Sequence, residues 1–404
     1  MIFSLFNKFS FALVAMVMAT GAFAQSFTVT GTIKGIKNGT KVTLRGKDNG
    51  QPVKFSALTQ GSSFVVKGCV KSPVQVRIEI SDKPESEYKK DEYPETRGIL
   101  FMLENTDYTV EAACIDSVPY TYSMEGGLMS KTPYMTIRGG EAQRQYMEWF
   151  DTTYRLQLAE DLANAAYRHE LLFSGKKRSE IDTAKVNSLE RVLNAARADL
   201  DKANVNFIAA HPNYAVSLLL QQEKTETPFA YSVEELDGLL NTFAGNYDKA
   251  RLAEFTKTVN DLKRYPREAQ YRDASLQTSD GKNVQLADCI VKGKYNFIDC
   301  WASWCGPCRA AIPSVKEMYK RLGDKVNVIS ISVDKKNADW QQALKEENMP
   351  WRQYITTTEG AKQLKEAYML RFVPTLMVID PEGHIQVYTN DPAVAHRYLE
   401  EHVK

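Results

Sequence analysis

The stretch Trp301-Ala302-Ser303-Trp304-Cys305-Gly306-Pro307-Cys308 decides the fold of one end of this 404-residue chain. It follows an apolar run at residues 295–298 and opens an amphipathic pattern that predicts a helix to about residue 322. The two cysteines then lie one helical turn apart and can close a small, reversible disulfide. Unpaired N–H groups and the helix dipole favour a thiolate at Cys305, the candidate nucleophile, whereas Cys308, shielded inside the first turn, is the candidate resolving thiol.

Two further features accompany this motif: Asp299 lies two residues before the first Trp, and Arg371-Phe372-Val373-Pro374-Thr375-Leu376 follows later. Together they resemble the thioredoxin superfamily over roughly residues 267–404. The resemblance implies that Asp299 is a buried carboxylate beneath the helix and that Pro374 is a cis-proline facing the disulfide. The chain looks most like the exported TlpA/ResA-type thiol-disulfide oxidoreductases, because the long segment between Asp334 and Pro374 leaves room for an extra helix and strand.

Strand alternation suggests a role for Asp299, which should share the face of Trp301 and point into the core. Desolvation would raise the pKa of this carboxyl group and suit it to accept the proton of Cys308 during resolution. A Lys that assists this Asp in some thioredoxins falls at Ser330, so that proton relay is absent or altered.

The surface beside the disulfide is the predicted site for substrate. Trp304 would give a flat apolar shoulder, and the backbone of Val373 could pair with an extended peptide. The predicted substrate-binding residues are Trp304, Gly306, Pro307, Val373 and Pro374.

Other cysteine chemistries fit the sequence less well. A structural zinc site needs four ligands, and Cys69, Cys114, Cys289 and Cys300 form no second close pair, so we predict no metal. Peroxiredoxin-type peroxidases resemble one another in a Thr or Ser three residues before the reactive Cys, a position held here by Ala302. Cys300 is expected to be a buried, inert thiol, whereas Cys69 and Cys114 could form a structural disulfide or remain thiols.

The amino-terminal segment predicts export. Lys8 precedes an apolar run at residues 9–19 and a small-residue cleavage site, Ala22-Phe23-Ala24, so residues 1–24 are predicted to be a cleaved signal peptide that directs the chain to a periplasm. An uncleaved anchor is the alternative. The whole chain has 51 basic and 50 acidic residues, a balance that argues against nucleic acid as a partner.

The remaining sequence predicts a multidomain protein. Residues 25–135 show short alternating runs with Gly-rich turns, which predict an all-β, sandwich-like domain, and resemble an uncharacterised β-domain found ahead of some exported thioredoxin-like domains. Residues 136–265 show apolar spacings of three and four, which predict an α-helical connector or domain with a capping box at Ser232 and Glu235. Residues 266–404 alternate strands and helices, as the α/β thioredoxin fold requires.

These features predict an exported oxidoreductase that reduces protein disulfides through a Cys305/Cys308 dithiol. Gly-Pro between the cysteines is the dipeptide of reducing thioredoxins, and no His lies between them. The sequence contains no Gly-rich dinucleotide fingerprint, so we predict no cofactor and infer a membrane-embedded electron donor as the partner that recharges the dithiol. The alternatives are a disulfide isomerase or oxidase, and a partner-binding scaffold whose redox domain is secondary.

Overall fold

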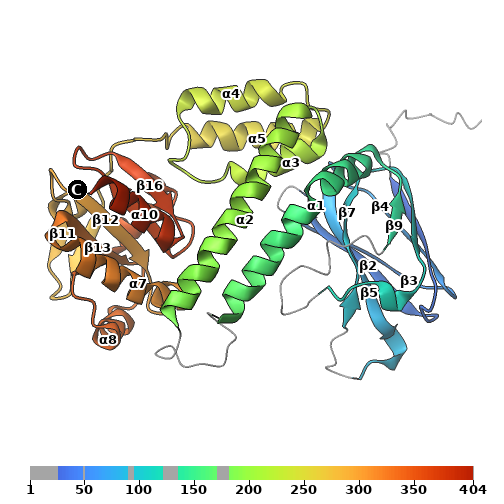
Figure 1. Cartoon of the computed structure of the whole chain (residues 1–404), viewed down its shortest axis with the longest axis horizontal. Coiled ribbons are helices and arrows are strands. Elements are labelled where there is room, and N and C mark those ends of the chain that lie inside the picture. Colours follow the sequence, from blue (N-terminus) through green and yellow to red (C-terminus); the bar gives the residue numbers. More distant parts are fainter. Residues whose placement is uncertain (1–25, 49–50, 90–94, 122–134, 171–181, 404) are drawn as a thin grey trace, which may run out of the picture. The chain divides into compact units, whose positions relative to one another are not determined.

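The computed structural model describes residues 26–48, 51–89, 95–121, 135–170 and 182–403 (Figure 1). The predicted signal peptide, residues 1–24, therefore lies outside the described residues. The chain divides into two compact units, Met1–Arg144 and Gln145–Lys404. No helix within the described ranges is long and apolar enough to cross a lipid bilayer.

The first unit is built from two β-sheets around one apolar core. One sheet has the order β4-β1-β8-β9, and the other has the order β3-β2-β5-β6, with β7 pairing with β5. Alternate residues of β1 and β8 are buried, which confirms the all-β prediction. The strands are β1 (Phe27–Ile33), β2 (Thr40–Asp48), β3 (Gln51–Leu58), β4 (Ser63–Gly68), β5 (Val74–Pro84), β6 (Thr96–Arg97), β7 (Leu100–Leu103), β8 (Asp107–Ala112) and β9 (Thr136–Arg138).

Cys69 and Cys114 are not joined in a disulfide. Cys69 follows Gly68, which pairs with Phe27 at one end of β1, whereas Cys114 follows the strand that pairs with Ile33 at the other end. Six residues of strand place these ends about 20 Å apart. A disulfide needs Cα atoms within about 7 Å, so this sheet register keeps the two thiols separate.

Between residues 135 and 265 the described residues, 135–170 and 182–265, form five α-helices, as the spacing of apolar residues predicts. The capping box of α4 forms as expected: Ser232 Oγ accepts the Glu235 N–H at 3.2 Å, and the Glu235 carboxylate accepts the Ser232 N–H at 2.7 Å. The helices are α1 (Glu141–Arg168), α2 (Thr183–Ala210), α3 (Ala215–Lys224), α4 (Val233–Phe243) and α5 (Lys249–Leu262).

The carboxy-terminal region forms a seven-stranded sheet of order β11-β10-β14-β13-β12-β15-β16. The near-central strand β12 is parallel to β13 and antiparallel to β15. The strands are β10 (Ser275–Thr278), β11 (Asn283–Gln285), β12 (Tyr295–Trp301), β13 (Val326–Ser332), β14 (Arg352–Thr356), β15 (Thr375–Ile379) and β16 (Ile385–Thr389). The helices are α6 (Leu286–Cys289), α7 (Gly306–Leu322), α8 (Asn337–Glu347), α9 (Thr358–Tyr368) and α10 (Pro392–His402).

Helices cover both faces of this sheet, so the multidomain fold with a carboxy-terminal α/β domain is confirmed. Buried side chains of α7, α8 and α10 pack on one face, and those of α6 and α9 pack on the other. Phe297 and Trp301 of β12 point to the α7 face, whereas Ile298 and Cys300 point to the α9 face. The α7 face therefore also receives Asp299, because side chains alternate along the strand.

Two aromatic residues that precede the sheet complete its α9-side core. The Phe229 ring lies 5.5 Å from the Tyr388 ring, and the Tyr265 hydroxyl donates to the Glu366 carbonyl at 2.7 Å. The predicted boundary at residues 265/266 thus falls directly after a core residue. The boundary at 135/136 falls just before β9, which pairs with β8.

Candidate active site

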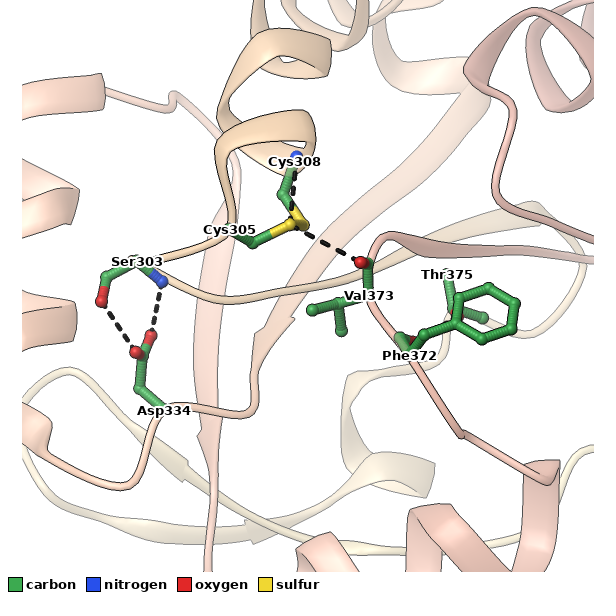
Figure 2. The surroundings of a disulfide bond; sticks show 7 residues. All are labelled: Ser303, Cys305, Cys308, Asp334, Phe372, Val373 and Thr375. Carbon is green, nitrogen blue, oxygen red and sulfur yellow. Dashed lines mark hydrogen bonds between the residues drawn. A yellow bond between two sulfur atoms is a disulfide. The ribbon is translucent and has the colours of Figure 1, made fainter. Parts of the chain in front are cut away.

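Cys305 and Cys308 lie where β12 gives way to α7, and they are joined in a disulfide (Figure 2). Cys305 is the N-cap residue of α7, and its Sγ accepts the Cys308 backbone N–H at 3.2 Å. Pro307 follows in the first turn, where a missing N–H breaks no helical hydrogen bond. The first sulfur therefore receives a donor that would stabilise negative charge on it.

The two cysteines are equally buried, each with 4% of its surface exposed. Shielding of Cys308 alone, expected from its place inside the helix, is therefore not what distinguishes the two sulfurs. The distinction is one of position, since Cys305 occupies the N-cap and receives the backbone donor. The residues around it, Trp304, Gly306 and Pro307, are exposed, so the surface beside the disulfide can be approached.

The loop before β15 faces this disulfide, as the resemblance implies. The Val373–Pro374 peptide bond is cis, and the Val373 carbonyl oxygen lies 3.6 Å from Cys305 Sγ (Figure 2). The hydroxyl of Thr375 donates to the Phe372 carbonyl at 2.9 Å and ties the loop to the start of β15. A backbone carbonyl thus lies beside the candidate nucleophile, where an extended peptide could pair with this loop.

Asp299 is buried on the α7 face, with 5% of its surface exposed. Burial raises the pKa of its carboxyl group to about 7, although a hydrogen bond from Ser330 opposes this effect. The Ser330 hydroxyl donates to Asp299 Oδ2 at 3.0 Å from the paired position on β13. The side chain that replaces the Lys of some thioredoxins is therefore in direct contact with the carboxylate.

A second carboxylate, Asp334, holds the loop that leads into Cys305. It accepts the Ser303 backbone N–H at 2.8 Å and the Ser303 hydroxyl at 2.7 Å (Figure 2). Ser332 donates to the same carboxylate at 2.7 Å. Asp334 belongs to no catalytic motif in the sequence, although polar residues at 330, 332 and 334, alternating with apolar ones, signal a polar row on a buried strand.

Part of the chain is similar to known thioredoxin-like proteins. A family model described as thioredoxin-like matches residues 293–385. Thiol-disulfide oxidoreductase ResA of Bacillus subtilis is 27% identical over 111 residues, which cover 27% of this chain and 59% of ResA. Nucleoredoxin of Mus musculus is 32% identical over 114 residues, which cover 27% of this chain and 25% of nucleoredoxin. The crystal structure of the thioredoxin domain of a thiol-disulfide oxidoreductase from Bacteroides vulgatus is 25% identical, with a TM-score of 0.32, and the match covers 34% of this chain and 97% of that one.

The carboxy-terminal domain is thioredoxin-like and related to the ResA thiol-disulfide oxidoreductases. Its CxxC pair is Cys305 and Cys308.

The positive charge closest in sequence to the CxxC pair of the thioredoxin-like domain is compensated. The Arg309 guanidinium pairs with Glu346 at 2.7 Å and with Glu347 at 2.6 Å, both at the end of α8. These hydrogen bonds raise the pKa of Arg309, which keeps its charge in the ion pairs. Arg309 therefore adds little net positive potential at Cys305.

Two large aromatic side chains are exposed on the thioredoxin-like domain. Trp304, next to Cys305, is 69% exposed, which suits the predicted apolar shoulder. Phe372 is 55% exposed, but its ring points away from the disulfide (Figure 2). The other cysteines of the domain, Cys289 and Cys300, are packed in the α9-side core, where burial raises the pKa of both thiols.

Proposed function

We propose that this chain is an exported thiol-disulfide oxidoreductase that reduces the disulfides of other proteins. The observation that carries the proposal is the position of Cys305 Sγ, which accepts the Cys308 N–H at the start of α7 and lies 3.6 Å from the carbonyl that precedes cis-Pro374. In the reduced form, this arrangement would stabilise a Cys305 thiolate beside a backbone edge for an extended peptide. Related ResA proteins, named as thiol-disulfide oxidoreductases, support the same chemistry.

Reduction would proceed in two exchange steps. In the dithiol form, the Cys305 thiolate attacks one sulfur of the substrate disulfide, which forms a mixed disulfide and releases the other substrate sulfur as a thiolate. Cys308 then gives its proton to Asp299 and attacks Cys305 Sγ, which closes the Cys305–Cys308 disulfide and releases the second substrate thiolate. Two electrons have then passed from the enzyme to the substrate.

The charges around the CxxC pair support the reducing direction. Strong oxidants of this class stabilise the thiolate form of the dithiol, which raises their reduction potential. Here Gly306 and Pro307 carry no charge, and the guanidinium of Arg309 is paired with two glutamates. The dithiol should therefore have a potential near that of thioredoxins, about −270 mV, and would need a membrane-embedded donor to recharge it after export.

Titrating the Cys305/Cys308 couple of the full-length protein against glutathione buffers tests the direction. We expect a reduction potential nearer −270 mV than −120 mV, the value of strongly oxidising relatives. A reduction potential more positive than about −180 mV would contradict the reductase proposal and favour isomerase or oxidase activity. The Cys305→Ser/Cys308→Ser double variant is the control, and it should show no redox transition in this range.

The scaffold alternative can be separated from this proposal by a deletion within the first unit. Removing residues 25–139 keeps α1 to α5, and with them the Phe229 and Tyr265 rings that complete the core of the thioredoxin-like domain. If the deleted protein keeps full activity toward a physiological substrate, the two β-sheets of the first unit do not select that substrate. If that activity falls while insulin reduction persists, these sheets form a partner-binding domain.

A further inference from the structure

Three buried side chains form a hydrogen-bonded chain that ends on Asp299. Trp351 Nε1 donates to Ser330 Oγ at 2.9 Å, and Ser330 Oγ donates to Asp299 Oδ2 at 3.0 Å. Ser330 is completely buried, and Trp351 is 6% exposed. The hydrogen-bonded chain joins side chains of β12, of β13 and of the residue that precedes β14. The Asp299 carboxylate is therefore connected through Ser330 to Trp351.

The chemistry of the indole fixes the direction of this chain. An indole N–H can only donate, so Ser330 Oγ must be the acceptor of Trp351. The single hydroxyl proton of Ser330 is then left for Asp299, which can accept it only through an oxygen lone pair. A hydrogen bond donated to a carboxylate stabilises its charged form and opposes the effect of desolvation.

The surroundings of Asp299 provide no other stabilisation of that charge among the residues the structure describes. On β15 the residue paired with Asp299 is the apolar Leu376, and the apolar core of this face includes Cys308 and Ile312 of α7. Cys300, the neighbouring thiol, points to the opposite face. Within the described ranges, no Lys, Arg or second carboxylate shifts the pKa of Asp299. Burial raises this pKa, and the hydrogen bond from Ser330 lowers it.

We propose that Ser330 is a positioning residue that keeps Asp299 able to accept the proton of Cys308, and that Trp351 fixes the Ser330 hydroxyl in the donating orientation. The inference rests on the proposed role of Asp299 in the resolving step. The Ser330 hydroxyl, oriented by the Trp351 indole, would then stabilise the charged form of Asp299 by hydrogen bonding. A nearby ammonium group could stabilise the same form by its positive charge.

Replacing Ser330 by Ala in the oxidised full-length protein tests the inference. Losing a hydrogen bond to a buried charge should raise the pKa of Asp299 by about one unit, measured by carbon-13 NMR of labelled aspartate carboxyls, with the signal assigned by its loss in Asp299→Asn. In kinetic measurements, the midpoint of the pH profile for collapse of the mixed disulfide should rise equally, and the rate at pH 7 should fall about fivefold. Trp351→Phe should shift both midpoints upward by less, and Ser330→Thr, which keeps the hydroxyl, should restore them.

Ser332→Ala is the matched control, because Ser332 is equally buried on the same face of β13 but donates to Asp334. Whatever it does to the rate, it should leave both midpoints unchanged. Unchanged midpoints in Ser330→Ala, or an equal shift in Ser332→Ala, would overturn the inference. If Ser330→Ala does not fold, an unchanged midpoint in Trp351→Phe overturns it instead. If the NMR midpoint rises in Ser330→Ala while the wild type reduces no protein disulfide, the hydrogen-bonded chain stands and only the proposed function fails.

Discussion

Replacing Asp299 by Asn should stabilise the carboxy-terminal domain, and the gain should grow with pH. Burial raises the pKa of this carboxyl group from 3.8 to about 7, so between these values the folded state holds a proton that the unfolded state has lost. The free energy of unfolding of the wild type therefore falls as pH rises from about 4 through 7, and the loss is constant above that range. A rise of about 3 units, at 1.36 kcal/mol each, corresponds to about 4 kcal/mol.

Urea unfolding of the oxidised wild type and Asp299→Asn between pH 5 and 9 would measure this gain. Tryptophan fluorescence reports mainly on the relevant domain, because four of the five tryptophans lie in it: Trp301, Trp304, Trp340 and Trp351. Asn has no proton to lose, so the two proteins should differ by about 2 kcal/mol at pH 5 and by about 4 kcal/mol at pH 9.

The exposed Asp339 of the same domain supplies the control for this experiment. Asp339→Asn removes a favourable charge from the first turn of α8 and should give a small offset in the free energy of unfolding that does not change with pH. The result that would refute this reasoning is a difference in the free energy of unfolding between wild type and Asp299→Asn that is equal at every pH or largest at pH 5. Burial would then not disfavour the charged form of Asp299.

Three further predictions concern the exchange reaction. Cys308→Ser should accumulate mixed disulfides with substrate proteins on non-reducing gels, whereas Cys305→Ser should trap none; equal trapping by both variants would reverse or remove the assignment of roles. Asp334→Ala frees the loop that leads into Cys305 and should slow its attack on a peptide disulfide about tenfold in stopped-flow measurements, and an unchanged rate would show that the loop needs no such tie. Trp304→Ala should raise KM for a protein substrate about tenfold; Phe372→Ala, whose exposed ring points away from the disulfide, is its control and should stay near the wild-type KM.

The sequence predicts the chemistry of the CxxC motif because that chemistry is local. Two cysteines three positions apart at the start of a helix must lie one turn apart, and the first must lie at the unpaired N–H groups. The side of the sheet on which Asp299 lies is also determined locally, because successive side chains of a strand point to opposite faces. Asp299 therefore shares the α7 face with Trp301. The elements at 295–301, 337–347 and 375–379 were likewise predictable from their own residues.

Edge strands were harder to predict, because their own residues carry a weaker pattern. In β3, Val53, Phe55 and Ala57 alternate with exposed residues, but they are only partly buried, so the contrast between the two faces of the strand is weaker than in a core strand. The strand pairs with β2 alone at the edge of its sheet.

Only the tertiary structure decided which polar groups support the disulfide. Ser303 meets Asp334 across 31 positions of the chain, and Trp351 meets Ser330 across 21. Both contacts depend on the parallel register that places Ser330 beside Asp299, and a shift of one residue would turn the polar row of β13 to the other face of the sheet. The CxxC motif by itself thus determined which sulfur atoms exchange electrons. The pairing of distant strands determined which side chains contact the candidate proton acceptor, Asp299, and which carboxylate holds the loop that leads into Cys305.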